Sequence, residues 1–346
     1  MDTKILEGIE MKTSPECYLT AIASVLNFNG YDGESLVNHQ LGFAFRPPRK
    51  SDSDFNIRAF YNNDAYDSIY DSVGVRISSI CAKDWEECIG HIWAMLRTGQ
   101  PAIQFVDIFF IPYFPKDKGH AIHTLLVYGL DLSAGYIYVK SAMPGDWKIP
   151  LDNFRLACCS VSDRFTLKYR RLNFDYAVPN KPFELGEIFK RNIEMMERKD
   201  STDGCHYGLS GLQEFLKFVK KWIEIKEMNQ LLVINRAIFK QLISVVYQRK
   251  RYVAFLESEI PENAQLLKVY RYISVSWEIF RNMCFKLTRT IDENFLRRAL
   301  IRLEKTIELE VEGLDLIRNL NNREKSILVL DASTNLIRVG ECNGDR

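Results

Sequence analysis

Cys17 is the residue whose surroundings best fit a chemical role. Ser14 is a good helix N-cap and Pro15 suits the first helical position, so Cys17 is expected in the first turn of a helix that stops at Asn29–Gly30. Unpaired backbone N–H groups and the positive end of the helix dipole favour a thiolate there, and they could stabilise an oxyanion on an attacked acyl group. The pattern predicts a nucleophile. For most of the eight cysteines we expect small buried side chains.

A thiol nucleophile needs a base, and His123 is our prediction for it. His123 stands at the head of an apolar segment, residues 123–129, which is typical of a strand. From that position an imidazole can face a helix N-terminus across a cleft. His120, three residues earlier, is the alternative base. The competing interpretation is a loop histidine without a catalytic role.

The residue that orients the imidazole is expected to come from the next strand. Ser141 closes the predicted strand, although a hydroxyl stabilises an imidazolium less than a carboxylate would. Asp146 lies close downstream and could take its place, as could Asp152.

The elements that must position these side chains lie in the first 178 residues. Runs rich in Val, Ile, Phe and Tyr at 101–110, 123–132 and 135–142 predict strands, and 164–172 could extend the same sheet. Ser133–Ala134 between two of these runs indicates a hairpin turn. An early helix followed by antiparallel strands predicts an α+β domain over residues 1–178.

The second half of the chain has a different pattern. Apolar residues recur at helical spacing in four segments, which predicts a mainly helical domain over 183–325. The segment 177–182 contains two prolines and is the expected boundary. The tail, 326–346, reads as short and β-like, with a hairpin turn near Ser333–Asn335.

Composition excludes several classes of protein. The 346 residues include 46 Lys+Arg and 45 Asp+Glu, a formal net charge of +1, which argues against wholesale nucleic-acid binding. With 47% hydrophobic residues the chain is not disordered. It contains no metal-binding cysteine spacing, nucleotide-binding loop, secretory signal or membrane-spanning stretch. We therefore expect a cytoplasmic protein with no metal, no nucleic-acid partner and no membrane contact.

Basic residues concentrate in the helical half. Between Lys217 and Arg302 there are 17 Lys/Arg and 8 Asp/Glu, and Arg249, Lys250 and Arg251 form the densest cluster. A solvated helix face is one interpretation. The other is a docking surface for an acidic partner. An exposed stripe on this half could also pair two chains as a homodimer.

Five segments together resemble one known family. The chain is similar to the butirosin biosynthesis protein H family in the order and spacing of Ser14–Cys17, Gly99–Ala102, Val106–Tyr113, His123–Gly129 and Tyr138–Val139. The resemblance covers about 140 residues. Its most specific part is Asp107, two aromatic residues and Pro112–Tyr113, followed by a histidine.

This resemblance implies a papain-like fold and acyl transfer. The founding member moves an aminoacyl group from the phosphopantetheine thiol of an acyl carrier protein to an aminoglycoside amine. Carried over, Cys17 would accept the acyl group as a thioester, and His123 would activate Cys17 and then the amine. The phosphopantetheine would arrive with the carrier, so no bound cofactor is expected. Asp107 matches a family position and would line the pocket or hold the loop 112–115.

Two departures from the family pattern leave three functions open. Ser141 stands where the family usually has Asp, and no Gln precedes Cys17, so backbone N–H groups or Gln104 would have to stabilise the oxyanion. An acyltransferase in secondary-metabolite assembly is the favoured function. A cysteine hydrolase (a peptidase, amidase or thioesterase) with the same residues, or a non-catalytic papain-like scaffold, are the alternatives.

Overall fold

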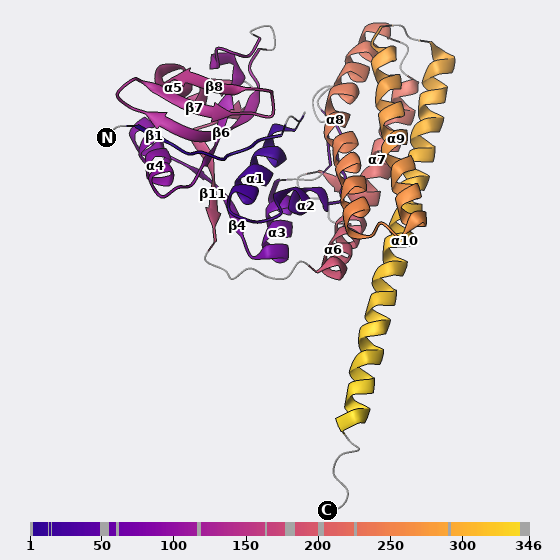
Figure 1. Ribbon diagram of the computed structural model, residues 1–346. Helices are drawn as coiled ribbons and strands as arrows, with labels where there is room; N and C mark the ends of the chain where they lie inside the picture. Colours follow the sequence, from indigo (N-terminus) through magenta and orange to yellow (C-terminus); the bar gives the residue numbers. More distant parts are fainter. Residues whose placement is uncertain are drawn as a thin grey trace, which may run out of the picture. The chain divides into compact units, whose positions relative to one another are not determined.

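The computed structural model divides the chain into two compact units (Figure 1). Unit 1 comprises Met1–Asn38 and Ala65–Pro182, and unit 2 comprises His39–Asp64 and Phe183–Arg346. The structure describes residues 3–12, 14, 16–48, 55–59, 62–115, 119–162, 165–176, 184–199, 204–224, 227–289 and 292–339. The predicted boundary at 177–182 lies outside these residues.

Unit 1 is built on an antiparallel sheet of seven strands, which confirms the predicted α+β class. The strand order is β4-β11-β5-β6-β7-β8, and β1 pairs with the end of β6. The strands are β1 (Thr3–Ile5), β4 (Arg76–Cys81), β5 (Ala102–Asp107), β6 (Ile122–Asp131), β7 (Tyr136–Lys140), β8 (Asp146–Pro150) and β11 (Arg170–Asp175). A small ladder pairs β9 (Val161–Ser162) with β10 (Phe165–Thr166). The predicted turn at 133–134 does connect β6 to β7.

Helices cover both faces of this sheet. They are α1 (Cys17–Phe28), α2 (Gly33–Asn38), α3 (Asn62–Val73), α4 (Trp85–Arg97) and α5 (Leu151–Cys159), with a 3₁₀ turn, η1 (Ile108–Phe110). Tyr18 of α1 packs on Phe105 of β5, with ring centroids 5.9 Å apart. Cys88 of α4 contacts Gln104, the neighbouring residue of β5. Because successive strand side chains alternate between faces, α1 and α4 pack on opposite sides of β5.

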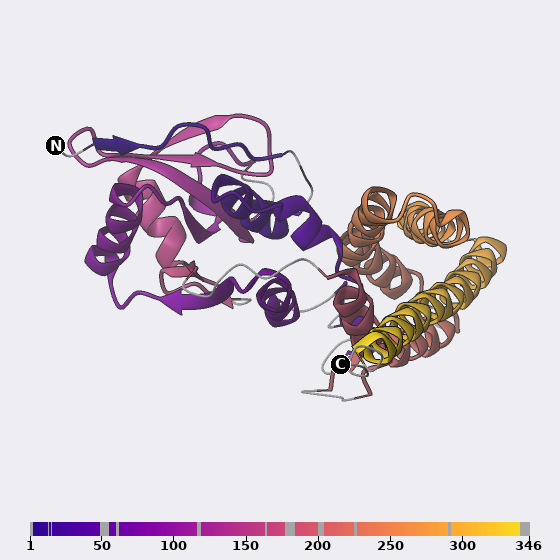
Figure 2. The ribbon, with the colours of Figure 1, turned by 60° about the horizontal axis from the view of Figure 1, so that its bottom comes forward.

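Unit 2 is mainly helical, as the apolar periodicity predicts. Its helices are α6 (Leu185–Glu197), α7 (Gly208–Ile223), α8 (Met228–Glu259), α9 (Ala264–Leu287) and α10 (Glu293–Val339). Figures 1 and 2 show α8, α9 and α10 as neighbouring helices. The core between them holds Trp222, Trp277 and Phe280 with almost no exposed surface. Gly208 (φ +53°) lets α7 begin close to α6, because a Cβ there would lie 2.1 Å from the Met196 carbonyl oxygen.

Residues 39–64, which the sequence analysis placed in the first domain, belong to unit 2. They supply β2 (Ala44–Arg46) and β3 (Asn56–Arg58), which form a small sheet with β12 (His206–Tyr207) in the order β12-β2-β3. Phe43, Phe45 and Phe55 are buried in the helical core. Burial of these aromatic rings explains why residues 39–64 belong to unit 2, because removing each ring from water into the helical core is favourable in free energy.

The predicted β-like tail at 326–346 is wrong for the residues that the structure describes. Helix α10 continues through the expected turn at Ser333–Asn335 and ends at Val339 (Figure 1). Extending a formed helix needs no new nucleation. A short apolar segment that could form either a strand or a helix therefore becomes helical when it continues a long helix. Residues 340–346 lie outside the described part.

Candidate functional site

Cys17 is the first residue of α1, which confirms its predicted place in the first helical turn. The N-cap is Glu16, not Ser14. The Ser14 hydroxyl oxygen instead accepts the Glu16 N–H at 3.1 Å, and the Ser14 N–H donates to the Ala142 carbonyl oxygen at 2.9 Å. These two bonds hold the segment before α1 against the end of β7. Pro15 lies outside the described residues.

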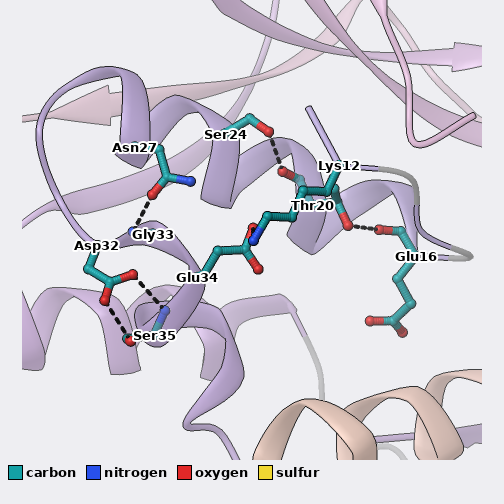
Figure 3. A network of polar contacts seen from close by, with 9 residues as sticks. All are labelled: Lys12, Glu16, Thr20, Ser24, Asn27, Asp32, Gly33, Glu34 and Ser35. Atoms are coloured by element: carbon teal, nitrogen blue, oxygen red, sulfur yellow. Dashed lines mark hydrogen bonds and ion pairs between the residues drawn. The ribbon is translucent and has the colours of Figure 1, made fainter. Parts of the chain in front are cut away.

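The first two turns of α1 are tied together by hydroxyl groups. Thr20 donates its Oγ1 hydrogen to the Glu16 carbonyl oxygen at 2.7 Å, and Ser24 does the same to the Thr20 carbonyl oxygen at 2.9 Å (Figure 3). At the other end of α1, the side chain of Asn27 accepts the Gly33 N–H at 2.8 Å and links α1 to α2 (Figure 3). The helix that carries Cys17 is therefore anchored at both ends.

The Cys17 thiol lies against β6. Its Sγ is 3.7 Å from the hydroxyl oxygen of Thr124. Burial raises the pKa of the Cys17 thiol, and the nearby Glu16 carboxylate raises it further. Hydrogen bonds from Thr124 lower the pKa but do not outweigh burial. Desolvation of the sulfur therefore opposes the thiolate that the helix N-terminus is expected to favour.

A raised pKa makes Cys17 a slow target for alkylation at neutral pH. We expect its rate with iodoacetamide, followed by peptide mass spectrometry, to keep rising with pH beyond the value of about 8.5 that is usual for a free thiol. Thr124→Val, which removes a hydrogen bond to the sulfur, should move the midpoint of the pH–rate profile of Cys17 to still higher pH. The exposed Cys81 of the same unit is an internal control for reagent reactivity. A Cys17 midpoint clearly below that of a free thiol would contradict this prediction.

His123 is the second residue of β6 and lies opposite Val106 of β5. Its ring packs edge-on against Phe114, with centroids 4.9 Å apart, and Phe114 in turn stacks on Trp147 at 6.1 Å. Thr124, not His123, is the hydrogen-bond partner of the Cys17 thiol among the described residues. Alternation along the strand separates the two neighbouring side chains. The pairing of Cys17 with His123 stays a prediction.

His120 has the better-defined environment of the two candidate bases. Its Nδ1 lies 2.7 Å from Oδ2 of Asp107, and its ring stacks on Phe109 with centroids 4.3 Å apart. Asp107 is fully buried, whereas 42% of the His120 side chain is exposed. Ser160 donates to the same carboxylate oxygen at 2.6 Å. A buried carboxylate thus fixes an imidazole whose other face reaches solvent.

The Asp107 carboxylate is held ionised. Burial opposes its charge, but hydrogen bonds from His120, Ser160 and the backbone N–H groups of Phe109 and Ala121 outweigh burial and lower its pKa. Because Phe109 N–H and Ala121 N–H both bind Oδ1, Asp107 also joins the end of β5 to the start of β6. These contacts give Asp107 a structural role at the junction of β5 and β6, whereas the sequence analysis placed that role at the loop 112–115.

Most of unit 1 that surrounds these residues matches one known protein family. Residues 16–141 match the family model described as butirosin biosynthesis protein H, N-terminal. This part of the chain is therefore similar to the amino-terminal domain of the butirosin biosynthesis protein H family. The match contains Cys17, Asp107, His120 and His123 and ends at Ser141. No curated protein matches the chain.

Ser141, at the end of the family match, is hydrogen-bonded to the backbone and not to a histidine. Its hydroxyl oxygen accepts the Met143 N–H at 3.0 Å, and the residue is buried. Asp146, the predicted substitute, pairs with Lys140 on the neighbouring strand, and 59% of its side chain is exposed. Asp146 is thus paired with a cation at the surface of unit 1 rather than with an imidazole.

Gln104 cannot serve as the predicted oxyanion donor. It is fully buried, and its amide nitrogen donates to the Arg170 carbonyl oxygen at 2.8 Å. It lies on the sheet face where Cys88 contacts it, whereas Phe105 and α1 pack on the other face. Strand alternation decides this, since Gln104 directly precedes the residue that faces α1.

Two contacts of the site were missed from sequence. The contact of Thr124 could have been predicted. Thr124 directly follows His123 on a predicted strand, so its side chain lies on the opposite face of the sheet from His123. No pattern in the sequence around Ser160 predicts its contact with Asp107. It lies 53 residues from Asp107 in the chain, and only folding brings the two together.

The predicted partner-binding cluster in unit 2 is wrong for one of its residues. Arg249 is buried with no exposed side-chain surface and pairs with Glu310 at 2.7 Å. Lys250 is exposed and pairs with Glu278 at 2.8 Å. Helical spacing explains the difference, because Arg249 falls on the apolar stripe of α8 and Lys250 on its outer side. Arg251 is partly exposed.

In the described part of the chain, no group of three or more His, Cys, Asp or Glu side chains could hold a metal ion. No helix among the described residues is long and apolar enough to cross a membrane.

Proposed function

We propose that unit 1 is a cysteine-dependent acyltransferase of secondary-metabolite assembly. In this reaction Cys17 accepts an acyl or aminoacyl group from a carrier-protein thioester and passes it to an amine or hydroxyl acceptor. The family of residues 16–141, named for the biosynthesis of an antibiotic, supports a biosynthetic role. The observation that carries the proposal is the Cys17 thiol at the first position of α1, where it lies 3.7 Å from the Thr124 hydroxyl.

The chemistry would proceed in two halves. A histidine takes the Cys17 proton, the sulfur attacks the thioester carbonyl, and the bond to the carrier thiol breaks as that thiol leaves with a proton. The acceptor amine then attacks the Cys17 thioester, gives its proton to the base and restores the thiol. Backbone N–H groups at the start of α1 have no partner within the helix, so they can stabilise the oxyanion in both halves.

Two imidazoles are available for the proton transfers. His123 is the proposed base for Cys17, since it lies at the start of β6 and within the family match. His120 is the alternative, and its bond to Asp107 fixes the ring and would stabilise an imidazolium. Phosphopantetheine would enter with the carrier protein. Exposed Lys250 and Arg251 remain candidates for carrier contact, whereas Arg249 does not.

A non-catalytic scaffold is the second candidate function. The raised pKa of Cys17, together with its bond to Thr124 rather than to a histidine, favours this alternative. A protonated thiol without an adjacent base would bind a partner but transfer no acyl group.

An acyl-enzyme test separates these functions. The full chain is incubated with acetyl- or butyryl-pantetheine, and its intact mass is measured before and after adding the amine of an aminoglycoside. We expect a covalent acyl adduct on the wild type but not on Cys17→Ala, and its transfer to the amine. Release to water without amide formation would indicate a hydrolase. Absence of any adduct, also with an acylated carrier protein, would contradict the acyltransferase and support the scaffold.

A further inference from the structure

Unit 2 contains a pocket that the proposed acyl transfer does not use. Its volume is about 840 Å³, within the range of roughly 300–1,000 Å³ usual for small-molecule sites. The pocket lies where the C-terminal half of α7 meets the beginning of α8 and the chain that follows β2. All of its lining residues belong to unit 2.

One side of the pocket is apolar and well packed. Phe45, Trp222 and Ile234 line it and are themselves at most 1% exposed. Phe218 packs on Phe45 with ring centroids 5.5 Å apart and completes the wall. The rings are held by this packing, so the wall exists before a ligand binds. The indole N–H of Trp222 is buried and has no hydrogen-bond partner among the described residues.

The other side carries an excess of positive charge. Three lysines of α7, Lys217, Lys220 and Lys221, line the pocket against two glutamates. Lys217 pairs with Glu214 at 2.7 Å and Lys220 with Glu304 at 2.8 Å, both with large exposed fractions. Exposed pairs of this kind contribute only about 0–1 kcal/mol, so a ligand anion can replace the carboxylates at little cost.

Lys221 is the lining cation that no carboxylate pairs with in the described part of the chain. The pocket also borders the beginning of α8, where Gln230 lines it. The first turn of α8 contains no acidic residue, and its N-cap makes no side-chain hydrogen bond. That N-cap residue is Glu227, whose carboxylate offsets the positive dipole end of α8, so the anion site rests on Lys221.

We propose that this pocket binds a small amphipathic anion. The ligand would have an aromatic or aliphatic body that packs on Phe45, Phe218 and Trp222, and a carboxylate, phosphate or sulfonate group near Lys221. The basic excess of this half of the chain would draw such a ligand in. This binding does not depend on Cys17, so its test is independent of the proposed acyl transfer.

The test uses 8-anilinonaphthalene-1-sulfonate, a fluorescent aromatic anion, titrated into the full chain. We expect saturable binding of one equivalent, weaker at high salt, and displacement by octanoate but not by octanol at the same concentration. Lys221→Glu should weaken binding at least about tenfold, which corresponds to about 1.4 kcal/mol.

Lys268→Glu is the matched control. Lys268 is exposed on α9, outside the pocket, and the substitution makes the same change in net charge. Its dissociation constant should stay within about twofold of the wild type. Thermal unfolding and near-UV circular dichroism of each variant exclude dye binding to a loosened fold. Equal weakening by both substitutions, or the lack of saturable binding by a folded wild type, would overturn the proposal.

Discussion

His123→Ala is expected to slow acyl loading of Cys17 by a factor of about 10² to 10⁴, the usual contribution of a positioned base. Burial keeps the Cys17 thiol protonated at neutral pH, so the first half of the reaction depends on a group that removes this proton. Loading is measured as the rate of the mass increase with butyryl-pantetheine. Imidazole added to the buffer should restore part of the rate in His123→Ala, which a merely structural loss would not allow.

His120→Ala is the matched comparison for this prediction. If His120 serves only the acceptor, loading should proceed at the wild-type rate, whereas transfer to the amine should slow. If His120→Ala loses loading and His123→Ala keeps it, the base is the imidazole fixed by Asp107, and the assignment of His123 is wrong. Urea unfolding of both variants shows whether either effect comes from a damaged fold.

Arg249→Met should lower the free energy of unfolding by about 3–5 kcal/mol. Arg249 donates its Nε hydrogen to Glu310 at 2.7 Å and an Nη1 hydrogen to the Gly42 carbonyl oxygen at 2.9 Å. Neither charged side chain is exposed, so removal of the guanidinium leaves the Glu310 carboxylate buried with only the Trp277 indole N–H, 2.7 Å away, to stabilise it. The loss is a large fraction of the roughly 5–15 kcal/mol that usually holds a domain folded.

Urea unfolding followed by circular dichroism at 222 nm measures this effect. The double substitution Arg249→Met with Glu310→Met should recover most of the loss, because it removes the unpaired buried charge as well. Lys250→Met, at the neighbouring exposed position, should change stability by no more than about 1 kcal/mol. Similar small effects at positions 249 and 250 would contradict the buried ion pair.

Local patterns were enough to predict most of the elements and the position of one candidate residue. The first-turn position of Cys17 follows from residues within a few positions of it, and the helices of unit 2 follow from an apolar period that each segment shows by itself. The antiparallel strands around His123 follow from β-branched and aromatic runs with a short turn between them. The resemblance to one family could also be recognised from the sequence, and the match over residues 16–141 confirms it.

The surroundings of these residues were decided by tertiary structure. Burial raises the pKa of Cys17, and hydrogen bonds from Thr124 lower it in part. The contact of Cys17 with Thr124 exists only because α1 packs against β6. The contact of Ser160 with Asp107 and that of Arg249 with Glu310 join residues 53 and 61 positions apart. Residues 39–64 join the helical unit through three phenylalanines that fit its core. Periodicity and capping act between near neighbours in the chain. Burial, pairing and pKa depend on which distant segments come to lie beside them.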